Sequence, residues 1–514
     1  MTGTRPAPPI APPALLAPPP VADLDWSPDR AESLGHDAVE LWRELLERLR
    51  DLPIGTARGV EEVRAAVAHE VPSEPLAHDA LLAYLRTLVL ENATYTGHPG
   101  FVAFISGAGT IPGAAADLLA AAINQNVGGW RLAPGATEIE LQLVRWFAGR
   151  LGLPATAGGF VTSGGAMSAF AGLKMARDAM AGWSVRQAGL RGQPPLTMYA
   201  SAESHVVNTR AADMLGLGSD AMRSIHVDAE LRMRVDRLRE AIVRDLRAGC
   251  RPVAVVASAG TVGTGAIDPL GEIADVCVEL GVWLHVDGAY GGVAALTDEL
   301  ARRFTGIDRA DSVALDPHKW LYTPHSGGVV LVRDERRLHE SFGVHASYVA
   351  EDKALTHRGV DFYELTPNFS RGFHALKIWI SLLAHGWSAY SRRIAHDVAL
   401  ARWLYERVLA EDTLEPVGPP PALSIACFRY VPPALRGRTD AEEYLNTLNE
   451  RIVNALQMGG RVFPSNVVLD GRYGIRACIV NFRTEAADME ALVQETVREG
   501  KRLDAELRTA GLSS

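Results

Sequence analysis

Cysteine is scarce in this sequence, and no two cysteines lie close together. The four cysteines, Cys250, Cys277, Cys427 and Cys478, are spread over a chain of 514 residues. Without a Cys-x-x-Cys pair, the spacing argues against a disulfide framework and against a zinc site, so no metal is expected. Cys277, Cys427 and Cys478 stand among apolar residues and are expected to be small core side chains.

The chain also lacks any concentration of positive charge. Its formal net charge is −10 at pH 7, and its 51 Lys and Arg residues are distributed along the whole sequence. A nucleic-acid-binding surface requires clustered basic residues, so nucleic acid is excluded as an expected partner. The composition is that of an ordinary globular enzyme.

No hydrophobic run is long enough to cross a membrane. The most apolar stretch, 101–127, is interrupted by Pro112, Asp117 and several glycines, so it does not predict a transmembrane helix. Residues 1–22 are rich in Pro and Ala, and they lack the cationic start and apolar core of a signal peptide. We therefore expect a disordered arm, no membrane partner and a cytoplasmic location.

The length exceeds what one hydrophobic core usually supports, so several lobes are expected. Ser27 and Pro28 begin an amphipathic helix, and strand and helix signals alternate further along, which favours a mostly parallel sheet covered on both faces. No internal repeat is found. The predicted segments are a disordered arm (1–22), an N-terminal helical segment (23–91), a large domain (92–386) and a small C-terminal α+β domain (387–514).

The most informative feature is a pair of short strands that end in a carboxylate and an amine. The apolar stretch 282–286 is followed by Asp287 and a Gly-rich turn. The stretch 312–315 is followed by Asp316-Pro317-His318-Lys319. Because ligands bind outside the carboxyl ends of parallel strands, Asp287 and Lys319 are expected to face one crevice.

A lysine and an acid placed in this way are the groups that pyridoxal phosphate requires. The lysine holds the aldehyde as a Schiff base. The acid keeps the pyridine nitrogen protonated, so that the ring can accept electrons from a carbanion at the substrate Cα. The alternative is a buried Asp–Lys ion pair that only joins two strands, but two motifs that each adjoin the right turn favour the cofactor.

The segments "LHVDGAY" and "DPHKW" resemble the markers of the pyridoxal-phosphate-dependent group II amino-acid decarboxylases, which include the aromatic-amino-acid and glutamate decarboxylases. The likeness extends from about His98 to about Arg483, with several motifs in the same order. It implies fold type I of pyridoxal enzymes: an α/β fold with a mostly parallel sheet in the large domain and a smaller C-terminal α+β domain. It also implies a homodimer with shared active sites, in which the N-terminal segment packs on the partner subunit.

The resemblance assigns the cofactor phosphate to the turn "TSGGAMSAF", where a Ser-Gly-Gly turn precedes a helix. The free N–H groups and the dipole of a helix start favour an anion, and the contacts fall on Gly165, Ala166 and Met167. His205 corresponds to a histidine that stacks on the pyridine ring beside the substrate carboxylate, although a capping or core histidine is the alternative interpretation.

Two positions depart from the family pattern. Thr261 matches the first threonine of a Gly-Thr-Thr loop, but Val262 replaces the second, and Asp316 stands where asparagine is common. His318 corresponds to a residue near the phosphate. The expected cofactor-binding set is Gly165, Ala166, Met167, His205, Thr261, Asp287, Ala289, Asp316, His318 and Lys319.

The resemblance implies decarboxylation of an L-amino acid to the amine and carbon dioxide. In the family, a tyrosine on a loop after the Schiff-base lysine returns a proton to Cα, and Tyr348 occupies that position. A phenylalanine there would favour aldehyde-forming chemistry, and an aromatic that only anchors the loop is the alternative. The expected catalytic residues are therefore Lys319, Asp287, His205 and Tyr348.

Two further segments correspond to those that line the substrate pocket in the family, one of them contributed by the partner subunit. Phe104 and Ile105 stand at apolar contacts. Gly107, Gly128 and Gly129 replace larger residues, and this loss of bulk predicts a cavity for an apolar side chain, either aromatic or large aliphatic.

Polar positions keep other substrates open. Ser106 and Asn126 match positions of the glutamate enzymes, and Arg131 could hold a side-chain carboxylate, so an acidic substrate is an alternative. Arg476 matches an arginine that can bind the substrate α-carboxylate, although such a residue is also common at a solvated strand edge. An aldehyde synthase or another fold type I lyase is a rival reading. A catalytically inactive scaffold is a second rival, which the complete catalytic set opposes.

Overall fold

The computed structural model describes residues 24–344 and 359–509. The chain forms two compact units, of which the first consists of Met1–Leu52 and Arg58–Ala93 and the second of Pro53–Ala57 and Thr94–Ser514. Among the described residues, no helix is both long enough and apolar enough to span a bilayer.

The first unit is helical. Its elements are α1 (Pro28–Arg48), α2 (Val60–Val67), α3 (His78–Arg86) and the π-helical turn η3 (Thr87–Glu91). The predicted start of α1 is confirmed, because the Ser27 side chain accepts a hydrogen bond from the Arg30 N–H at 3.3 Å. None of the residues of α1, α2 and α3 is buried.

The second unit contains a sheet of seven strands in the order β2-β8-β7-β6-β5-β3-β4. The strands from β3 to β7 pair in parallel, and β8 runs antiparallel to both of its neighbours. The predicted α/β fold with a mostly parallel sheet is confirmed. The strands are β2 (Gly158–Thr162), β3 (Leu196–Ser201), β4 (Met222–Ile225), β5 (Arg251–Ser258), β6 (Trp283–Gly288), β7 (Ser312–Leu315) and β8 (Gly328–Val332).

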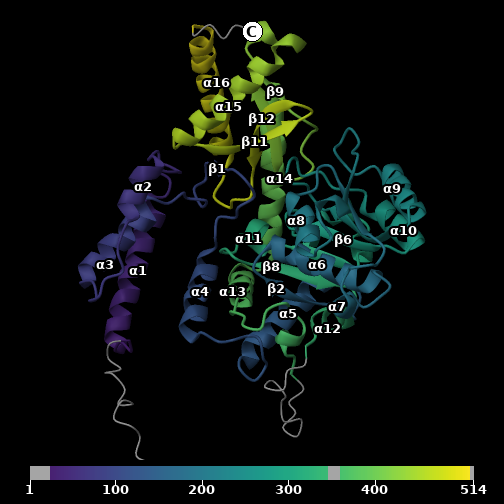
Figure 1. Ribbon diagram of the computed structural model, residues 1–514. Coiled ribbons are helices and arrows are strands. Elements are labelled where there is room, and N and C mark those ends of the chain that lie inside the picture. The colour runs from purple at the N-terminus through teal and green to yellow at the C-terminus, as the bar shows by residue number, and fades with distance from the viewer. Residues whose placement is uncertain (1–23, 345–358, 510–514) are drawn as a thin grey trace, which may run out of the picture. The chain divides into compact units, whose positions relative to one another are not determined.

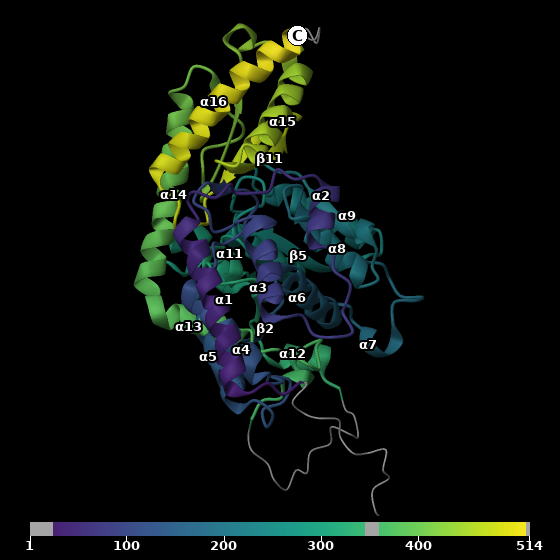
Figure 2. The same cartoon turned by 90° about the vertical axis from the view of Figure 1, so that its left-hand side faces the viewer.

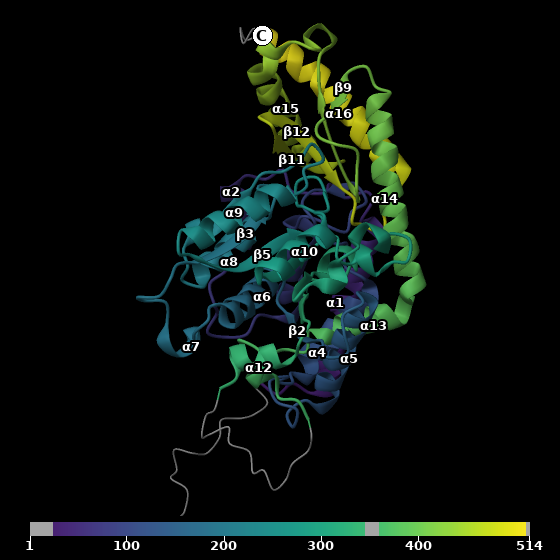
Figure 3. The ribbon, with the colours of Figure 1, turned by 90° about the vertical axis from the view of Figure 1, so that its right-hand side faces the viewer.

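Helices cover both faces of this sheet (Figures 1 and 3). α6 (Gly165–Met180) and α8 (Val206–Met214) lie on one face, whereas α9 (Val235–Arg247) and α10 (Leu270–Leu280) lie on the other. From Ala254 to Ala257, successive residues of β5 alternate between the two cores. Burial on both sides explains why the strand reads as a continuous apolar run.

Shorter and peripheral helices complete this lobe. α5 (Pro134–Arg150) packs on β2, and α13 (Ala375–His385) contacts both α4 (Ile111–Ile123) and α5. The short helices are α7 (Val185–Ala188), α11 (Pro317–Trp320) and α12 (Arg336–Phe342).

The long helix α14 (Trp387–Leu409) runs from the large sheet to a second, five-stranded sheet of order β1-β11-β12-β10-β9 (Figures 2 and 3). α15 (Glu442–Met458) and α16 (Ala486–Thr509) lie side by side on this sheet. Its strands are β1 (Phe101–Val102), β9 (Leu414–Pro416), β10 (Ile425–Tyr430), β11 (Phe463–Leu469) and β12 (Arg472–Cys478). Although β1 falls in the range predicted for the large domain, it pairs with β11 in the small one.

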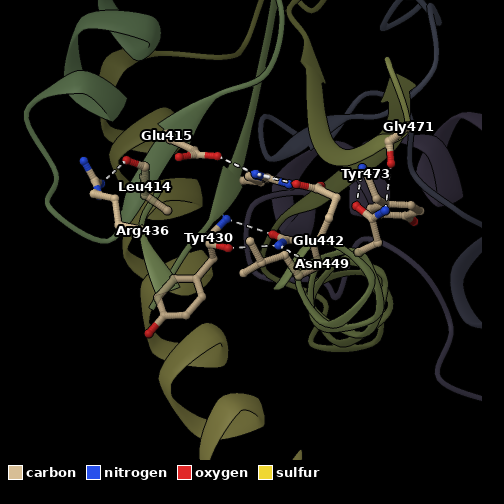
Figure 4. A network of polar contacts seen from close by, with 11 residues as sticks. Leu414, Glu415, Tyr430, Arg436, Glu442, Asn449, Gly471 and Tyr473 are labelled. Atoms are coloured by element: carbon tan, nitrogen blue, oxygen red, sulfur yellow. Dashed lines mark hydrogen bonds and ion pairs between the residues drawn. The ribbon is translucent and has the colours of Figure 1, made fainter. Parts of the chain in front are cut away.

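A polar network joins β10 to α15 within the small lobe (Figure 4). The buried Arg429 side chain forms ion pairs with Glu415 and Glu442. Asn449 accepts a hydrogen bond from Tyr430 N at 2.8 Å and donates one to Tyr430 O at 2.9 Å. Tyr430 pairs with Leu414 of β9 on one side, and Asn449 supplies the partners of its backbone on the other side, so this network stabilises the small lobe.

A buried ion pair fixes the chain segment that follows residue 358. Arg371 Nη2 lies 2.5 Å from Glu140 Oε1, and the two side chains are 6% and 1% exposed. Val161 N in β2 also donates to Glu140 Oε1 at 2.8 Å, and Arg371 Nη2 donates to Val161 O at 2.9 Å. The pair therefore ties this segment to both α5 and β2.

We expect Glu140→Ala to destabilise the fold by about 3–5 kcal/mol, because it leaves the Arg371 guanidinium buried without its counter-charge. The double variant Glu140→Ala/Arg371→Met removes both charges and should recover part of the loss. Thermal unfolding of the single and double variants measures this difference. Equal midpoints for the two would contradict the assignment.

Candidate active site

The site lies at the carboxyl ends of β5, β6 and β7. Pairing sets Ser258 opposite Asp287, and Asp287 opposite Ala314. β7 ends at Leu315 and leads directly into α11, which carries Lys319. The expectation that Asp287 and Lys319 leave the same edge of the sheet is therefore confirmed.

Asp287 is partly buried and accepts one N–H on each carboxylate oxygen. Ala289 N donates to Oδ1 at 3.2 Å, and Asn208 Nδ2 donates to Oδ2 at 2.9 Å. Hydrogen bonds to the charged form of a carboxyl group favour that form. Asn208 was not predicted from the sequence, although its position three residues after His205 places it on the same side of the start of α8.

His205 caps α8, as one of the two sequence interpretations allowed. Its Nδ1 accepts a hydrogen bond from Val207 N at 3.1 Å. Desolvation lowers the pKa of His205, although the nearby Asp287 charge opposes the shift. The ring is therefore neutral at neutral pH. Because Nδ1 is an acceptor, the proton is on Nε2.

Lys319 pairs with Asp316 across one turn of α11. Its Nζ lies 3.0 Å from Asp316 Oδ2, and the Lys319 side chain is 20% exposed while that of Asp316 is 2% exposed. Among the described residues, Asp316 Oδ1 is buried without a hydrogen-bond partner. His318 Nδ1 donates to Gly327 O at 2.6 Å, which fixes this ring beside the lysine.

The start of α6 packs against Asp316 and Ala289. A Cβ added at Gly165 would lie 2.6 Å from Asp316 Oδ2 and 3.3 Å from the Ala289 Cβ. The glycine therefore permits a close approach between the helix start and the residues beside Lys319 and Asp287. Gly165, Ala166 and Met167 form the first turn of α6. The N–H groups of Gly165 and Ala166 have no partner within the helix and suit an anion, whereas Met167 N donates to Gly164 O at 3.0 Å.

Thr261 is buried, and its backbone and side chain both form hydrogen bonds within its own loop. Thr261 N donates to Ala266 O at 2.8 Å, and Ala266 N donates to the Thr261 hydroxyl at 3.1 Å. The hydroxyl also lies 3.4 Å from Thr264 Oγ1. These contacts hold the loop, so the Thr261 hydroxyl is already engaged within the protein.

The segment from Phe104 to Gly107 packs directly on α11, the single turn of helix that carries Lys319 (the lysine turn). A Cβ added at Gly107 would lie 2.5 Å from Lys319 O and 2.8 Å from His318 O. Ile105 packs on the large core, and Ser106 is half-buried. Gly107 is therefore required for close backbone packing, and the prediction that it enlarges a cavity is wrong.

Phe104 is held in a strained conformation with its ring in the open. Its φ is 54°, which is unusual for an aromatic residue, and it is 62% exposed. Arg476 Nη1 donates to Phe104 O at 2.9 Å and to Ser465 Oγ at 3.1 Å. Phe104 N donates to Ser465 Oγ at 3.4 Å.

Arg476 is a buried residue of β12 and does not lie at a solvated edge. Besides Phe104, its Nε donates to Gly263 O at 3.1 Å, while Nη2 is buried without a partner in the described part of the chain. Arg476 thereby joins the small lobe to the Phe104 segment and to the loop that contains Thr261.

Asn126 and Gly128 pack against the segment that contains Phe369 and Arg371. Asn126 Oδ1 accepts hydrogen bonds from Gly128 N at 2.9 Å and from Arg371 N at 3.0 Å. A Cβ at Gly128 would lie 2.2 Å from Phe369 O, so this glycine too serves a close backbone approach and does not open a cavity. Gly129 has more room, because its nearest neighbour would be Asp361 Oδ1 at 3.6 Å.

The buried carboxylate of Asp397 binds two residues that follow Lys319 in the chain, Trp320 and Tyr322. Trp320 Nε1 and the Tyr322 hydroxyl donate to Asp397 Oδ2 at 3.0 and 2.6 Å, and Arg393 Nε lies 2.9 Å from Oδ1. Burial raises the pKa of Asp397 to about 7. Asp397 was missed from the sequence, although its spacing of three residues from Ile394 and four from Ala401 places it on the buried face of α14 and was a usable signal.

Tyr348 lies outside the described residues, so its predicted role stays a prediction. Within the described ranges, no group of three or more His, Cys, Asp or Glu residues could hold a metal ion.

The residues present fit pyridoxal phosphate. A lysine amine, a carboxylate stabilised by two N–H donors and the start of a helix meet at one sheet edge, and an orphaned carboxylate oxygen of Asp316 remains beside them. With the α/β fold, these groups define a fold type I pyridoxal phosphate enzyme.

Comparison with known proteins identifies the family. Residues 61–431 match the pyridoxal-dependent decarboxylase conserved domain, and the chain belongs to this family. It is 32% identical over 467 residues to an aromatic-L-amino-acid decarboxylase of Bacillus atrophaeus, covering 91% of this chain and 95% of the relative. It is 34% identical over 423 residues to an L-2,4-diaminobutyrate decarboxylase of Rhizobium meliloti (strain 1021), covering 82% of each.

Solved structures agree with this assignment. The crystal structure of Oryza sativa TDC with PLP and tryptamine matches with a TM-score of 0.86 and 26% identity, covering 93% of this chain and 99% of that chain. Mouse CSAD matches with a TM-score of 0.85 and 28% identity, covering 92% and 99%. The protein is a pyridoxal-phosphate-dependent amino-acid decarboxylase, a carboxy-lyase, and the predicted family, fold type and cofactor are confirmed.

We expect Gly107→Ala to shift the lysine turn, because its methyl group would overlap backbone oxygens of Lys319 and His318. Overpacking of this kind costs about 1–3 kcal/mol, and the variant should melt at a lower temperature and retain pyridoxal phosphate less well during gel filtration. Gly135→Ala is the matched control, since a Cβ there meets nothing within 4 Å. Identical cofactor retention in the two variants would contradict this reading.

Proposed function

We propose that the enzyme decarboxylates an L-amino acid with an apolar side chain, aromatic or large aliphatic, to the amine and carbon dioxide. The exposed Phe104 ring carries this proposal. The chain holds an aromatic residue in a strained conformation, 62% exposed, on a segment packed against Lys319. Strain of this kind persists only where the surroundings enforce it, and here Arg476 and Ser465 do so. An apolar ring so presented suits an apolar substrate.

Each site residue has a proposed role. Lys319 would hold the cofactor through its amine, the start of α6 would bind the phosphate, and Asp287 would pair with the pyridine nitrogen. When bound, pyridoxal phosphate supplies the electron-accepting ring that makes loss of carbon dioxide from Cα feasible. His205 is neutral with its proton on Nε2, so it would be available to donate a hydrogen bond to the substrate carboxylate beside the cofactor.

Two further roles follow from contacts and from position in the sequence. Three hydrogen bonds of Arg476 go to Gly263, Phe104 and Ser465, so we propose that it shapes the pocket by holding the Phe104 segment. Tyr348 is proposed to return the proton to Cα, on the sequence correspondence alone. Ser106 and Asn126 are proposed to line the pocket.

The alternatives concern the substrate and the product. An acidic substrate would need a cation for its side-chain carboxylate, and Arg131 is the candidate that the sequence offers. An aldehyde synthase is the second alternative, and one relative, a phenylacetaldehyde synthase of Arabidopsis thaliana, is 25% identical over 464 residues. The cytoplasmic location predicted from the sequence is also retained as a proposal.

A panel of L-amino acids tests the substrate and the reaction together. We expect aromatic or large aliphatic substrates to release carbon dioxide and amine in equal amounts, without aldehyde, ammonia or peroxide. Lys319→Ala should lose this activity. Borohydride added with the cofactor should not fix the cofactor to this variant, because the site then holds no amine. Preferred turnover of glutamate or 2,4-diaminobutyrate would refute the substrate proposal, and equimolar aldehyde would refute the reaction.

We further propose a homodimer in which the partner subunit completes the pocket. Leu118, Leu119 and Ile123 of α4 are 63%, 58% and 57% exposed, and the amphipathic helices of the first unit bury no residue. An apolar hollow of about 240 Å³ lies near the start of α4. Exposed apolar surface of this extent is typical of subunit interfaces. The hollow is lined by Thr110, Ile111, Tyr322, His385, Ala389, Tyr390, Arg393 and Phe482.

Sedimentation should give a mass twice that of one chain. We expect Leu119→Asp to weaken the dimer and to lower activity in parallel, because a charge would have to be buried at the interface. Val278→Asp is the matched control, since Val278 is 76% exposed on α10, and it should leave the dimer intact. A monomeric parental chain with full activity would disprove the dimer and the shared pocket.

A further inference from the structure

Asn208 is a buried amide in the first turn of α8, one helical turn beyond His205. Asn208 is only 1% exposed. The Nδ2 group donates to Asp287 Oδ2 at 2.9 Å and to Ser204 Oγ at 3.0 Å. Within residues 24–344 and 359–509, its Oδ1 is buried and has no partner.

The neighbours of Asn208 fix the orientation of its amide. An ionised carboxylate can only accept hydrogen bonds, so the NH₂ group must face Asp287. Turning the amide over would place its carbonyl oxygen against a carboxylate oxygen. The favoured orientation leaves a buried acceptor unsatisfied, which is unfavourable. An apolar residue of the same size would avoid this cost, so the packing of α8 does not explain Asn208.

The groups around Asp287 explain why such a donor matters. Lys319 forms its ion pair with Asp316, at 3.0 Å. The Asp287 charge acts on two imidazoles, His205 on α8 and His285 on β6, but desolvation lowers the pKa of both, that of His285 to about 4. Both rings are therefore neutral near pH 7. The Asp287 carboxylate is held by two neutral donors, Ala289 N and Asn208 Nδ2.

We propose that Asn208 is a positioning residue for the cofactor site: it fixes the rotamer of Asp287 and stabilises the ionised carboxylate that the pyridine nitrogen requires. The inference rests on the proposed role of Asp287. Hydrogen bonds to a charged group are stronger than neutral ones and favour the charged form. Ala289 N reaches one carboxylate oxygen, and Asn208 supplies the donor to the other, from the same helical turn that presents His205.

The test is the affinity of the full-length, cofactor-free protein for pyridoxal phosphate, followed by quenching of tryptophan fluorescence. Asn208→Leu keeps the side-chain size and removes the donor. We expect it to raise the dissociation constant about tenfold or more, in line with the loss of one charge-assisted hydrogen bond. It should also lower kcat with little change in KM. Asn208→Ala should show the same direction and replaces it if the leucine variant does not fold.

A double-mutant cycle with Asp287→Asn separates positioning from a general effect on α8. If Asn208 acts through Asp287, Asn208→Leu should change the affinity by less than about threefold in the Asp287→Asn background. An equal loss in both backgrounds would assign the effect to helix packing and overturn the proposal, as would parental affinity in Asn208→Leu. Thermal unfolding of the cofactor-free variants confirms that each is folded.

The same measurements distinguish this inference from the proposed function beneath it. No amino acid is present in the binding assay, so an error in the substrate assignment leaves the result unaffected. Parental affinity and turnover in Asp287→Asn alone would remove the role of Asp287 and this inference together. Impaired Asp287→Asn with parental Asn208→Leu would remove only the role of Asn208.

Discussion

The parallel pairing of β5, β6 and β7 is the constraint on which the active site depends. Because the three strands run in the same direction, their carboxyl ends meet at one edge. Asp287 ends β6, and the turn after β7 carries Lys319. Neither residue has to be brought there by a long loop, and both inherit their positions from backbone hydrogen bonds of a sheet buried on both faces.

The lysine turn is held from two sides by different means. On one side, Gly107 lets the chain pack against the backbone oxygens of His318 and Lys319. On the other, Trp320 and Tyr322 donate to the buried Asp397 carboxylate on α14. Since α14 also leads into the small lobe, this network links the position of the lysine to the domain that carries Arg476. A side chain that reacts covalently benefits from such support, because small displacements of a reacting group are costly.

Much of this arrangement could be predicted from the sequence, because it follows from local rules. Strand ends, turn glycines and helix starts identified Asp287, Lys319 and the first turn of α6, and the cap at Ser27 was also correct. Asn208 and Asp397 were missed because each acts through contacts between segments distant in sequence. Gly107 and Gly128 were misread because a missing side chain can mean close packing as readily as open space.

The same distinction explains why the reaction class is easier to infer than the substrate. The groups proposed to act on the cofactor stand at the ends of strands and at helix starts of one sheet, so a short motif determines where they lie. The groups that would meet the substrate side chain stand on connecting segments. Phe104 depends on Arg476 and Ser465 from the small lobe, and Gly128 depends on Phe369. Their positions result from packing between segments far apart in the chain, so the shape of the pocket is a property of the folded protein. The residues of the proposed cofactor site, by contrast, can be found in two short stretches of sequence.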